Sequence, residues 1–427
     1  MSTDAIVTHV VAAVAVIIAA SYAVGLLFRR VRQPEVIGQL LAGIVLGPSV
    51  LGRVGSHVSH ALFPSQIVPY LNVASQIALV LFLFAVGYEL DLRVLRQQRT
   101  AVPVVAAVTF VVPALLGILT AYVFEPLLRG AGEPDAAKLE FILFIGVAVS
   151  ITAVPVLASI IAEWRIAATV PGVTALAAAA LIDAAGWLVL AGVLVLASVS
   201  LNGSHAWLRA VAELACYVVI GILVVRPLLR KWLFRPSVIP GNDVPVAVAF
   251  AMASAWVTAA LGLHVIFGAF FAGVIMPRRD GEPAKDLLRP VAQTGKVLLP
   301  IFFMVAGLSV DIGSMRGTDF AILGIVLVVA VLGKLGAGFL AARWTGFGPR
   351  DSAVVGSLLN TRGLTELIAL NIGLSAGIIH QRLYTVLVVM AVLTTMATGP
   401  LLALLKLRPP VQSVPGADPY VETTRNL

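Results

Sequence analysis

The chain has 427 residues, of which 60% are hydrophobic and 12% are charged, and its mean hydropathy is +1.02. Soluble domains carry about 25% charged residues, so this composition excludes a soluble globular protein. The apolar runs are continuous rather than alternating, which excludes a β-barrel. The net charge of +8 fits basic cytoplasmic loops better than a nucleic-acid surface. The single cysteine, Cys216, excludes an internal disulfide and a thiolate metal cage.

Runs of about 20 apolar residues, the length that spans a bilayer, recur along the chain. They predict an all-α polytopic membrane protein with about 13 transmembrane helices, in one transmembrane domain over residues 1–405. Residues 406–427 contain Pro409, Pro410 and Pro415 and are expected to form a short, disordered cytoplasmic tail. The predicted spans are 5–28, 35–52, 68–88, 101–124, 138–162, 167–199, 206–226, 243–261, 263–277, 292–312, 319–343, 350–376 and 381–405.

The distribution of basic residues predicts the orientation of these spans. Most of the 29 Lys and Arg residues fall in odd-numbered loops and in the C-terminal tail. The positive-inside rule then places the N-terminus outside and the C-terminus in the cytoplasm, in a bacterial-type inner or plasma membrane. The first span is no cleaved signal peptide, because Asp4 precedes it and Arg29 and Arg30 follow it, opposite to the charge order of a secretory signal.

The fifth span contains a proline that interrupts it. In "AVSITAVPVLASII", Pro155 lacks an N–H and clashes with the preceding turn. Ser150 and Thr152 lie just before it, where hydroxyl groups can satisfy backbone groups that the break frees. A plain proline kink is the alternative interpretation.

The twelfth span contains polar residues that cannot face lipid. "SLLNTRGLTELIALNIG" carries Asn360, Arg362, Gly363 and Glu366, and charges inside a membrane normally face a protein interior or a water-filled cavity. Arg362 and Glu366 are four residues apart and can pair on one helix face. Asn360 and Gly363 also indicate a local break.

The two interrupted spans are seven apart, so they run in opposite directions. If spans 2–6 and 9–13 are equivalent, each five-helix unit has its broken helix in fourth place. This arrangement is typical of inverted-repeat transporters, in which two crossed, discontinuous helices form the substrate site near the midplane. No residue-level repeat supports the symmetry, which is therefore a hypothesis.

Asp183 is the one ionisable residue in the sixth span, and Lys334 lies in the middle of the eleventh. Desolvation disfavours the charged form of a carboxylate, so protons and monovalent cations would compete for Asp183. Such competition supports exchange if the site faces one side of the membrane at a time. A structural ion pair between Asp183 and Lys334 is the alternative.

Five stretches, in this order, resemble a known family. They are "QPEVIGQLLAGIVLGPSVLG" (33–52), "LFLFAVGYELDL" (81–92), "LGLHVIFGAFFAGVIMP" (261–277), "LLPIFFMVAGLSVDI" (298–312) and "LNTRGLTELIALNIG" (359–373). The chain thus resembles the monovalent cation/proton antiporter superfamily in its second branch. This branch includes bacterial sodium/proton antiporters, potassium efflux antiporters and plant cation/proton exchangers.

The resemblance implies a homodimer in which a mobile core moves against dimerisation helices in an elevator-like, alternating-access cycle. Asp183 would be the carrier of the proton or of the metal ion, Na⁺ or K⁺, with Thr152, Ser150 and Asn360 as neighbouring ligands. Lys334, Arg362 and Glu366 would compensate charge, and Pro155 and Gly363 would break the helices. The partners would be monovalent cations, protons and membrane lipid, with no nucleic acid and no cofactor.

The chain departs from the family at one position beside the carrier. Family members usually have Asp, Asn or Gln immediately before the carrier aspartate, and this chain has Ile182. Ile182 supplies neither a ligand nor a proton. A single acid favours 1:1 exchange, but the stoichiometry and the ion selectivity stay open.

Three other functions remain as alternatives. A proton-coupled exporter of an organic cation or metabolite could use the same fold and the same aspartate. A channel would need a continuous pore with rings of ligands, and the sequence has no filter-like repeat. An intramembrane protease would need a second facing aspartate or a Ser/His pair, and His264 lies at the edge of a span. We therefore expect a transporter and not an enzyme.

Overall fold

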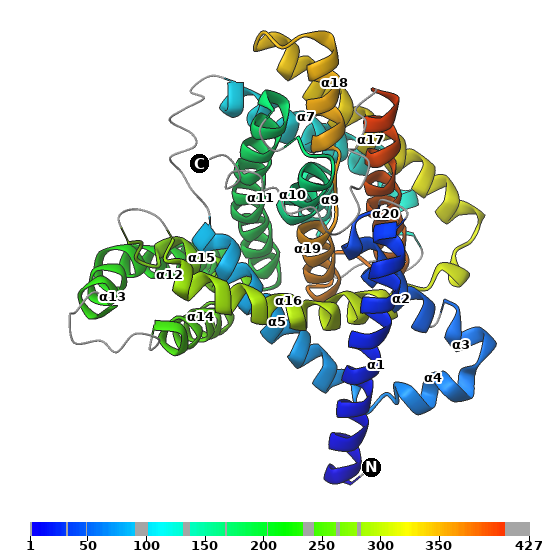
Figure 1. The fold of residues 1–427 in the computed structure, drawn as a ribbon, viewed down its shortest axis with the longest axis vertical. Coiled ribbons are helices and arrows are strands. Elements are labelled where there is room, and N and C mark those ends of the chain that lie inside the picture. Colours follow the sequence, from blue (N-terminus) through cyan, green and yellow to red (C-terminus); the bar gives the residue numbers. More distant parts are fainter. Residues whose placement is uncertain are drawn as a thin grey trace, which may run out of the picture.

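The structure is a computed structural model that describes residues 2–405 except 31–32, 48, 90–100, 131–136, 167–168, 203, 234–242, 262–264 and 280–282. The predicted tail, 406–427, lies outside the described residues. The N-terminal half contains α1 (Thr3–Arg30), α2 (Glu35–Leu46), α3 (Leu51–Val54), α4 (Ser56–Leu62), α5 (Val68–Glu89), α7 (Ala101–Val123), α8 (Glu125–Arg129), α9 (Lys138–Ser150), α10 (Val154–Glu163) and α11 (Val170–Asn202). The C-terminal half contains α12 (Ser204–Ile220), the π-helix η1 (Gly221–Val225), α13 (Arg226–Leu233), α14 (Asp243–Ala260), α15 (Val265–Ile275), α16 (Lys285–Leu308), the 3₁₀ turn η2 (Ile312–Ser314), α17 (Gly317–Trp344), α18 (Pro349–Leu359), α19 (Leu364–Ser375) and α20 (Gln381–Leu404) (Figure 1).

The helices agree with the prediction of a polytopic all-α membrane protein. Within the described part of the chain, ten helices are long and apolar enough to cross a membrane. Each of the predicted spans overlaps a helix or a pair of helices. Several boundaries differ, and two of the larger differences are at α16 and α2. α16 begins at Lys285 rather than at 292, because its charged first turns remain helical beyond the apolar part. α2 ends at Leu46 rather than at 52, where Gly47 is extended (φ −85°, ψ −169°).

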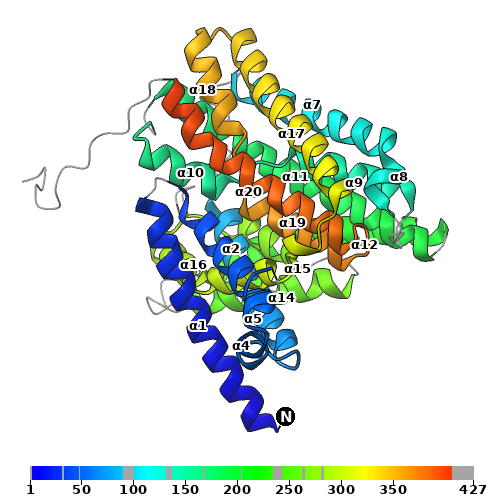
Figure 2. The same cartoon turned by 90° about the vertical axis from the view of Figure 1, so that its right-hand side faces the viewer.

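Close backbone packing divides most of the helices into two groups. In the first group, α7, α9, α10, α11, α17, α18, α19 and α20 pack on one another. In the second group, α1, α2, α5, α14, α15 and α16 pack on one another. Figures 1 and 2 show the first group mainly in the upper part and the second group mainly in the lower part of each view, with α2 next to α20. We call these groups the core helices and the scaffold helices.

Few polar contacts join the core helices to the scaffold helices. The described hydrogen bonds between them include Gln33 Nε2 to Met396 O (3.3 Å), Tyr384 Oη to Ala306 O (3.3 Å) and Asp311 N to Thr385 Oγ1 (3.4 Å). Gln381 also donates to Ser309 O. The rest of the boundary is apolar, because one buried cluster contains side chains from α5 and α15 together with side chains from α9, α11 and α19.

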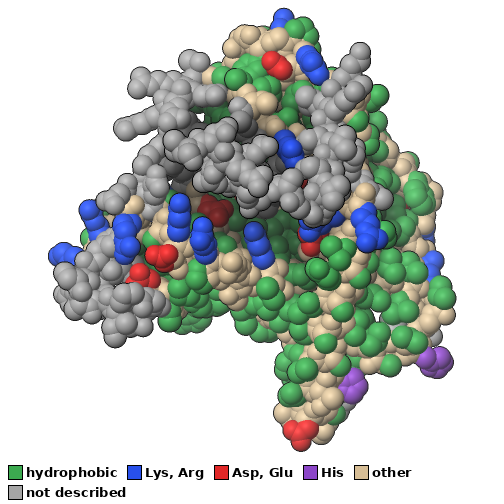
Figure 3. All heavy atoms as spheres, in the orientation of Figure 1, with side chains coloured by type: hydrophobic (Ala, Val, Ile, Leu, Met, Phe, Trp, Pro, Cys, Tyr) green, Lys and Arg blue, Asp and Glu red, His purple; other side chains and the backbone are tan. Residues whose placement is uncertain are grey.

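The outer surface carries a high proportion of apolar side chains. Trp256 is 70% exposed and Leu188 is 74% exposed. Many other large hydrophobic side chains are also exposed. Figure 3 shows hydrophobic side chains over much of one face, with Lys and Arg side chains in a band across the middle of the view. An apolar surface of this extent is typical of contact with a membrane or with another protein.

Candidate functional site

The first broken helix is interrupted just before Pro155. α9 ends at Ser150, residues 151–153 are not helical, and α10 begins at Val154. Pro155 is therefore the second residue of α10, in the first turn, where no intrahelical partner exists for a backbone N–H. The chain can leave one helix and start another without losing a hydrogen bond at the proline.

The second broken helix is interrupted at Asn360–Gly363. α18 ends at Leu359 and α19 begins at Leu364. Gly363 has φ +150°, a conformation that other residues rarely adopt. A Cβ at Gly363 would lie 2.8 Å from Val156 Cγ2 on α10. A glycine is needed here for both the backbone angle and the close approach to the first broken helix.

The two breaks contact each other directly. Ala153 N donates to Thr361 O at 3.3 Å, and Thr152 Oγ1 donates to Leu359 O at 3.3 Å. Each interruption thus satisfies backbone groups of the other, as buried non-helical backbone in a membrane requires.

Lys334 of α17 binds the end of α9. Its side chain is wholly buried. Its Nζ donates to Thr109 O of α7 at 3.1 Å, to Thr152 Oγ1 at 2.7 Å and to Ser150 O. All three ammonium protons therefore have acceptors, and none of these acceptors is Asp183.

Arg362 binds the same end of α9 from the other break. Its guanidinium donates to Ala148 O at 3.1 Å and to Val149 O at 2.6 Å. It also pairs with Glu366 Oε1 at 2.9 Å, and both side chains are 0% exposed. The pairing predicted from their spacing is therefore present.

The end of α9 thus faces two cations. The carboxyl end of a helix carries a partial negative charge, and the last carbonyl groups of α9 accept from Arg362 and Lys334. The hydrogen-bond acceptors of the Lys334 and Arg362 side chains are on α7, on α9, at Thr152 and on Glu366, and none of them is a carbonyl group of residues 359–363. Two cations therefore compensate the carboxyl end of α9, and the Glu366 carboxyl group lies in the first turn of α19, at the positive end of that helix.

Asp183 lies on α11 and is 4% exposed. No hydrogen-bond partner reaches its Oδ1. The Thr365 hydroxyl and the Trp187 indole N–H are close enough to the Asp183 carboxyl group to interact with it electrostatically. Neither Thr365 Oγ1 nor Trp187 Nε1, however, has a partner within hydrogen-bond distance and angle. Asp183 forms no ion pair with Lys334, so the alternative of a structural Asp183–Lys334 pair is wrong.

The other predicted ligands differ in how far their polar atoms are already used. Ser150 Oγ donates to Val147 O within its own helix at 2.9 Å. Thr152 Oγ1 both accepts from Lys334 and donates to Leu359 O. Asn360 donates through Nδ2 to Thr394 O at 3.3 Å, but its Oδ1 is buried without a partner. Asn360 is therefore a better candidate ligand than Ser150 or Thr152.

The sequence analysis missed several residues of this region. Thr365 and Trp187 interact with Asp183, and Thr395 on α20 accepts from Arg362 N at 2.9 Å and donates to Arg362 O at 2.7 Å. Trp187 could have been found, because it lies four residues after Asp183 on the same helix face. Thr365 was more weakly indicated by the sequence, where its hydroxyl group lies between the charged residues Arg362 and Glu366 in the chain.

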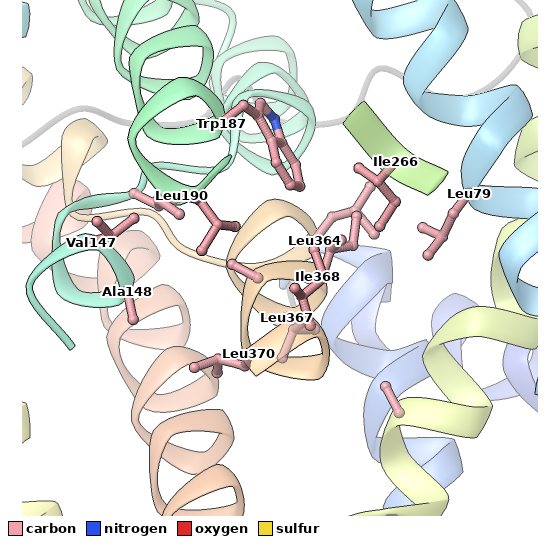
Figure 4. Close-up of a cluster of buried hydrophobic side chains, with 14 of the residues drawn as sticks. Leu79, Val147, Ala148, Trp187, Leu190, Ile266, Leu364, Leu367, Ile368 and Leu370 are labelled. Atoms are coloured by element: carbon pink, nitrogen blue, oxygen red, sulfur yellow. The ribbon is translucent and has the colours of Figure 1, made fainter. Parts of the chain in front are cut away.

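The site borders the apolar boundary between the core and scaffold helices. Figure 4 shows Trp187 of α11 above the first turn of α19, where Leu364 and Ile368 lie, with Ile266 of α15 nearby. Trp187 packs edge-to-face on Phe267 of α15, with 6.0 Å between ring centroids. The carboxyl group is therefore held away from bulk water in this conformation.

The fold and the site define a membrane transporter in which a buried carboxyl group lies beside two broken helices. A family model, the transmembrane region of the sodium/hydrogen exchanger, matches residues 14–406. The Na(+)/H(+) antiporter NhaS4 of Synechocystis is 33% identical over 396 residues, which cover 92% of this chain and 96% of that protein. The chain therefore belongs to the sodium/hydrogen exchanger family, and the resemblance to the cation/proton antiporter superfamily is confirmed.

Two further similarities extend the comparison. Cation/H(+) antiporter 20 of Arabidopsis thaliana is 37% identical over 401 residues, which cover 90% of this chain and 47% of that protein. The chain thus spans about half the length of this plant relative. A solved structure, the sodium proton antiporter MjNhaP1 from Methanocaldococcus jannaschii, has a TM-score of 0.68 at 15% identity and covers 95% of this chain and 99% of that one. At this identity the match shows a shared fold. Proteins of this family are transporters rather than enzymes.

Proposed function

We propose that the chain exchanges a monovalent cation, Na⁺ or K⁺, for protons across a membrane. The observation that carries this proposal is the Asp183 carboxyl group, which is buried beside the broken helices with an unpartnered oxygen. The names of the relatives support it, since they include a Na(+)/H(+) antiporter and a K(+)/H(+) antiporter. A deprotonated carboxylate binds one hard monovalent cation through oxygen, and a protonated one is neutral.

Competition between the proton and the cation at Asp183 gives exchange. In either loaded form the carboxyl group carries no net charge, so it can remain in an apolar environment. The empty carboxylate is the unfavourable form. Because Lys334 and Arg362 are already bound to α9, they do not compete with the transported cation for this carboxylate. One acid then carries one proton or one cation in each half-cycle.

The remaining predicted residues hold the broken helices in place. Lys334, Arg362 and Glu366 compensate the end of α9, and Gly363 brings the second break against α10. Ser150 and Thr152 act mainly on the backbone in this conformation. Asn360 is the candidate ligand at the second break, because its Oδ1 is unpartnered.

Alternating access is proposed to occur by movement of the core helices along the scaffold helices. The apolar boundary and its few hydrogen bonds support such sliding, since little polar bonding must break. Thirteen crossings follow if α15 and the two broken helices each span the membrane. Spans 2–6 and 9–13 would then be inverted repeats.

The orientation and assembly are also proposals. The basic loops support an N-terminus outside and a C-terminus in the cytoplasm of a bacterial-type inner or plasma membrane. The lipid-facing scaffold helices would form the interface of a homodimer. A proton-coupled exporter of an organic cation has no specific observation in its favour.

The test uses purified protein in proteoliposomes with an imposed pH gradient and an interior pH dye. Na⁺, K⁺, Li⁺ and Rb⁺ are added in turn to the wild type and to Asp183→Asn. We expect at least one cation to collapse the gradient in the wild type and none to do so in the variant. A wild type that moves no proton with any of these ions would overturn cation antiport. A variant that still exchanges would remove Asp183 from the carrier role.

A further inference from the structure

Three buried polar groups meet around α11 and α19 without hydrogen-bond partners. They are Asp183 Oδ1, Thr365 Oγ1 and Trp187 Nε1. Nearly all buried polar side-chain atoms in proteins have a partner, so unpartnered oxygens on and beside the Asp183 carboxyl group are candidate ligand positions. Thr365 is 0% exposed and Trp187 is 3% exposed, so bulk water does not satisfy these groups.

The chemistry of the three groups limits what can bind there. An indole N–H only donates, a carboxylate only accepts, and a threonine hydroxyl does both. Trp187 can therefore stabilise the charged carboxylate but cannot bind a cation through Nε1. Thr365 can donate to the empty carboxylate and can turn its oxygen toward a cation bound there.

The residue before Asp183, Ile182, offers no polar group to the site. Ile182 is 1% exposed and belongs to an apolar cluster with residues of α10 and α18, including Val156 and Leu358. A polar side chain at position 182 would enter that cluster. Trp187, by contrast, belongs to the separate cluster that contains Leu364 at the start of α19. The polar neighbours of Asp183 therefore come from the α19 side.

We propose that Thr365 is a ligand of the transported cation, which lies between its hydroxyl oxygen and the Asp183 carboxylate. Thr365 thereby replaces the oxygen that Ile182 cannot provide. The inference rests on the proposed function, because it assigns a second ligand to the same site. It also predicts that cation affinity depends on a residue of the second broken helix rather than on one of the first.

The experiment compares Thr365→Val and Thr365→Ser in the proteoliposome assay, with Thr398→Val as a matched control. Valine keeps the shape of threonine and removes its oxygen, whereas serine keeps the oxygen. Thr398 is also 0% exposed, and its hydroxyl donates to Thr394 O. Thr398→Val therefore makes the same substitution at a buried position away from Asp183. The apparent KM for the cation and the maximal rate are measured separately.

We expect Thr365→Val to raise the cation KM about tenfold, the size of one lost polar partner of a charged ligand, with the maximal rate within about twofold. Thr365→Ser and Thr398→Val should keep the wild-type KM. A second measurement, the shift of the melting temperature by NaCl or KCl relative to choline chloride, reports binding without transport. This salt-dependent shift of the melting temperature should be smaller than in the wild type for Thr365→Val and unchanged for Thr365→Ser and Thr398→Val.

Two results would overturn the inference while leaving the proposed function intact. One is an unchanged KM and an unchanged salt-dependent melting shift in Thr365→Val. The other is a serine variant as impaired as the valine variant, which would mean that the shape of the side chain matters and not its oxygen. If the wild type itself shows no cation-dependent exchange, the proposed function fails first.

Discussion

The two broken helices are interrupted in a similar way and differ in electrostatics. Both interrupt a membrane helix with a few non-helical residues, and each satisfies backbone groups of the other. The end of α9 binds two buried cations, Lys334 and Arg362. The second break carries Arg362, whose guanidinium is directed to α9 and Glu366, and it retains unpartnered oxygens on Asn360, Thr361 and, at the start of α19, Thr365.

This electrostatic difference indicates that the two breaks have different roles. A cation would be repelled by the first break, where two positive charges already occupy the negative end of a helix dipole. The second break offers free oxygens and lies beside Asp183. We infer that the first break is a structural joint and that the second supplies the ligands. The following predictions test this contrast, beginning with the largest effect.

Arg362→Met should produce the largest loss of stability. The substitution leaves the Glu366 carboxylate buried without its partner and frees Ala148 O and Val149 O. Removal of one member of a buried ion pair costs about 3–5 kcal/mol. Thermal unfolding in detergent should show a much lower melting temperature, and the exposed Arg350→Met serves as control.

A double-mutant cycle with Glu366→Gln tests how the guanidinium is held. Glu366→Gln alone should cost less, about 1–3 kcal/mol, because Arg362 keeps its two carbonyl acceptors. The double variant should be more stable than Arg362→Met alone, since no charge is left unpaired. Equal losses in the two single variants would mean that the ion pair, and not the end of α9, holds Arg362.

Lys334→Met should have the next largest effect. It removes three hydrogen bonds and leaves Thr109 O and Ser150 O buried without a cationic partner. An unsatisfied buried acceptor costs about 1–3 kcal/mol, partly offset by the loss of a buried charge. The melting temperature should decrease, whereas Arg343→Met, at the exposed end of the same helix, should change it little. If exchange is lost with no change in stability, Lys334 belongs to the transport chemistry and the first break is more than a joint.

The positions of the helices and breaks could be predicted from the sequence, but the partners could not. Apolar runs located each predicted span near a helix, and Pro155 and Gly363 marked the interruptions. The spacing of Arg362 and Glu366 predicted their ion pair. These features depend on local sequence, which hydropathy and backbone chemistry report well.

The use of each polar atom depends on contacts between helices far apart in the chain. An ion pair of Lys334 with Asp183 was the alternative that the sequence left open, but Lys334 binds Ser150 O and Thr109 O. Ser150 and Thr152 were predicted as ligands together with Asn360, although their hydroxyl groups are already hydrogen-bonded. Thr365 was missed, because nothing local distinguishes it from other buried threonines. Only the crossing of the breaks decides which oxygen is left without a partner.

Gly363→Ala should disturb the contact between the breaks. The added Cβ would meet Val156 at 2.8 Å, and the residue would have to adopt φ +150°. Backbone strain of this kind costs about 1–3 kcal/mol. A lower melting temperature together with slower exchange is expected. Gly324→Ala, in the middle of α17 with open space around the new Cβ, should be neutral or slightly stabilising.

Thr152→Val and Ser150→Ala should have small effects that differ from each other. Thr152→Val removes the acceptor of Lys334 and the donor to Leu359 O, which should cost about 1 kcal/mol. Ser150→Ala removes a bond within one turn of α9 and should change stability by less than about 0.5 kcal/mol. Both should keep the cation KM near that of the wild type. A tenfold increase in the cation KM of either variant would mean that the first break supplies ligands of the cation.

Glu125→Gln should produce the smallest effect, at the outer end of the first broken helix. Glu125 of α8 binds Lys138, the first residue of α9, at 3.0 Å, and Arg129 at 3.3 Å. The Lys138 ammonium, with Arg129, holds the pKa of the Glu125 carboxyl below its usual range. A carboxyl group with a lowered pKa stabilises the fold above the pKa of the unfolded chain, and this contribution is lost as the pH falls through the folded-state value.

The melting temperature of Glu125→Gln should therefore lie slightly below that of the wild type at pH 7, and the two should converge in acid. High salt should also reduce the difference, because the partners are near the surface. Exchange at neutral pH should be unchanged, since this anchor lies outside the breaks. If the difference in melting temperature persists in acid, it arises from packing and not from the charge of Glu125. If the cation KM changes, the contacts at the start of α9 affect the cation ligands, which would contradict the inference that the first break has only a structural role.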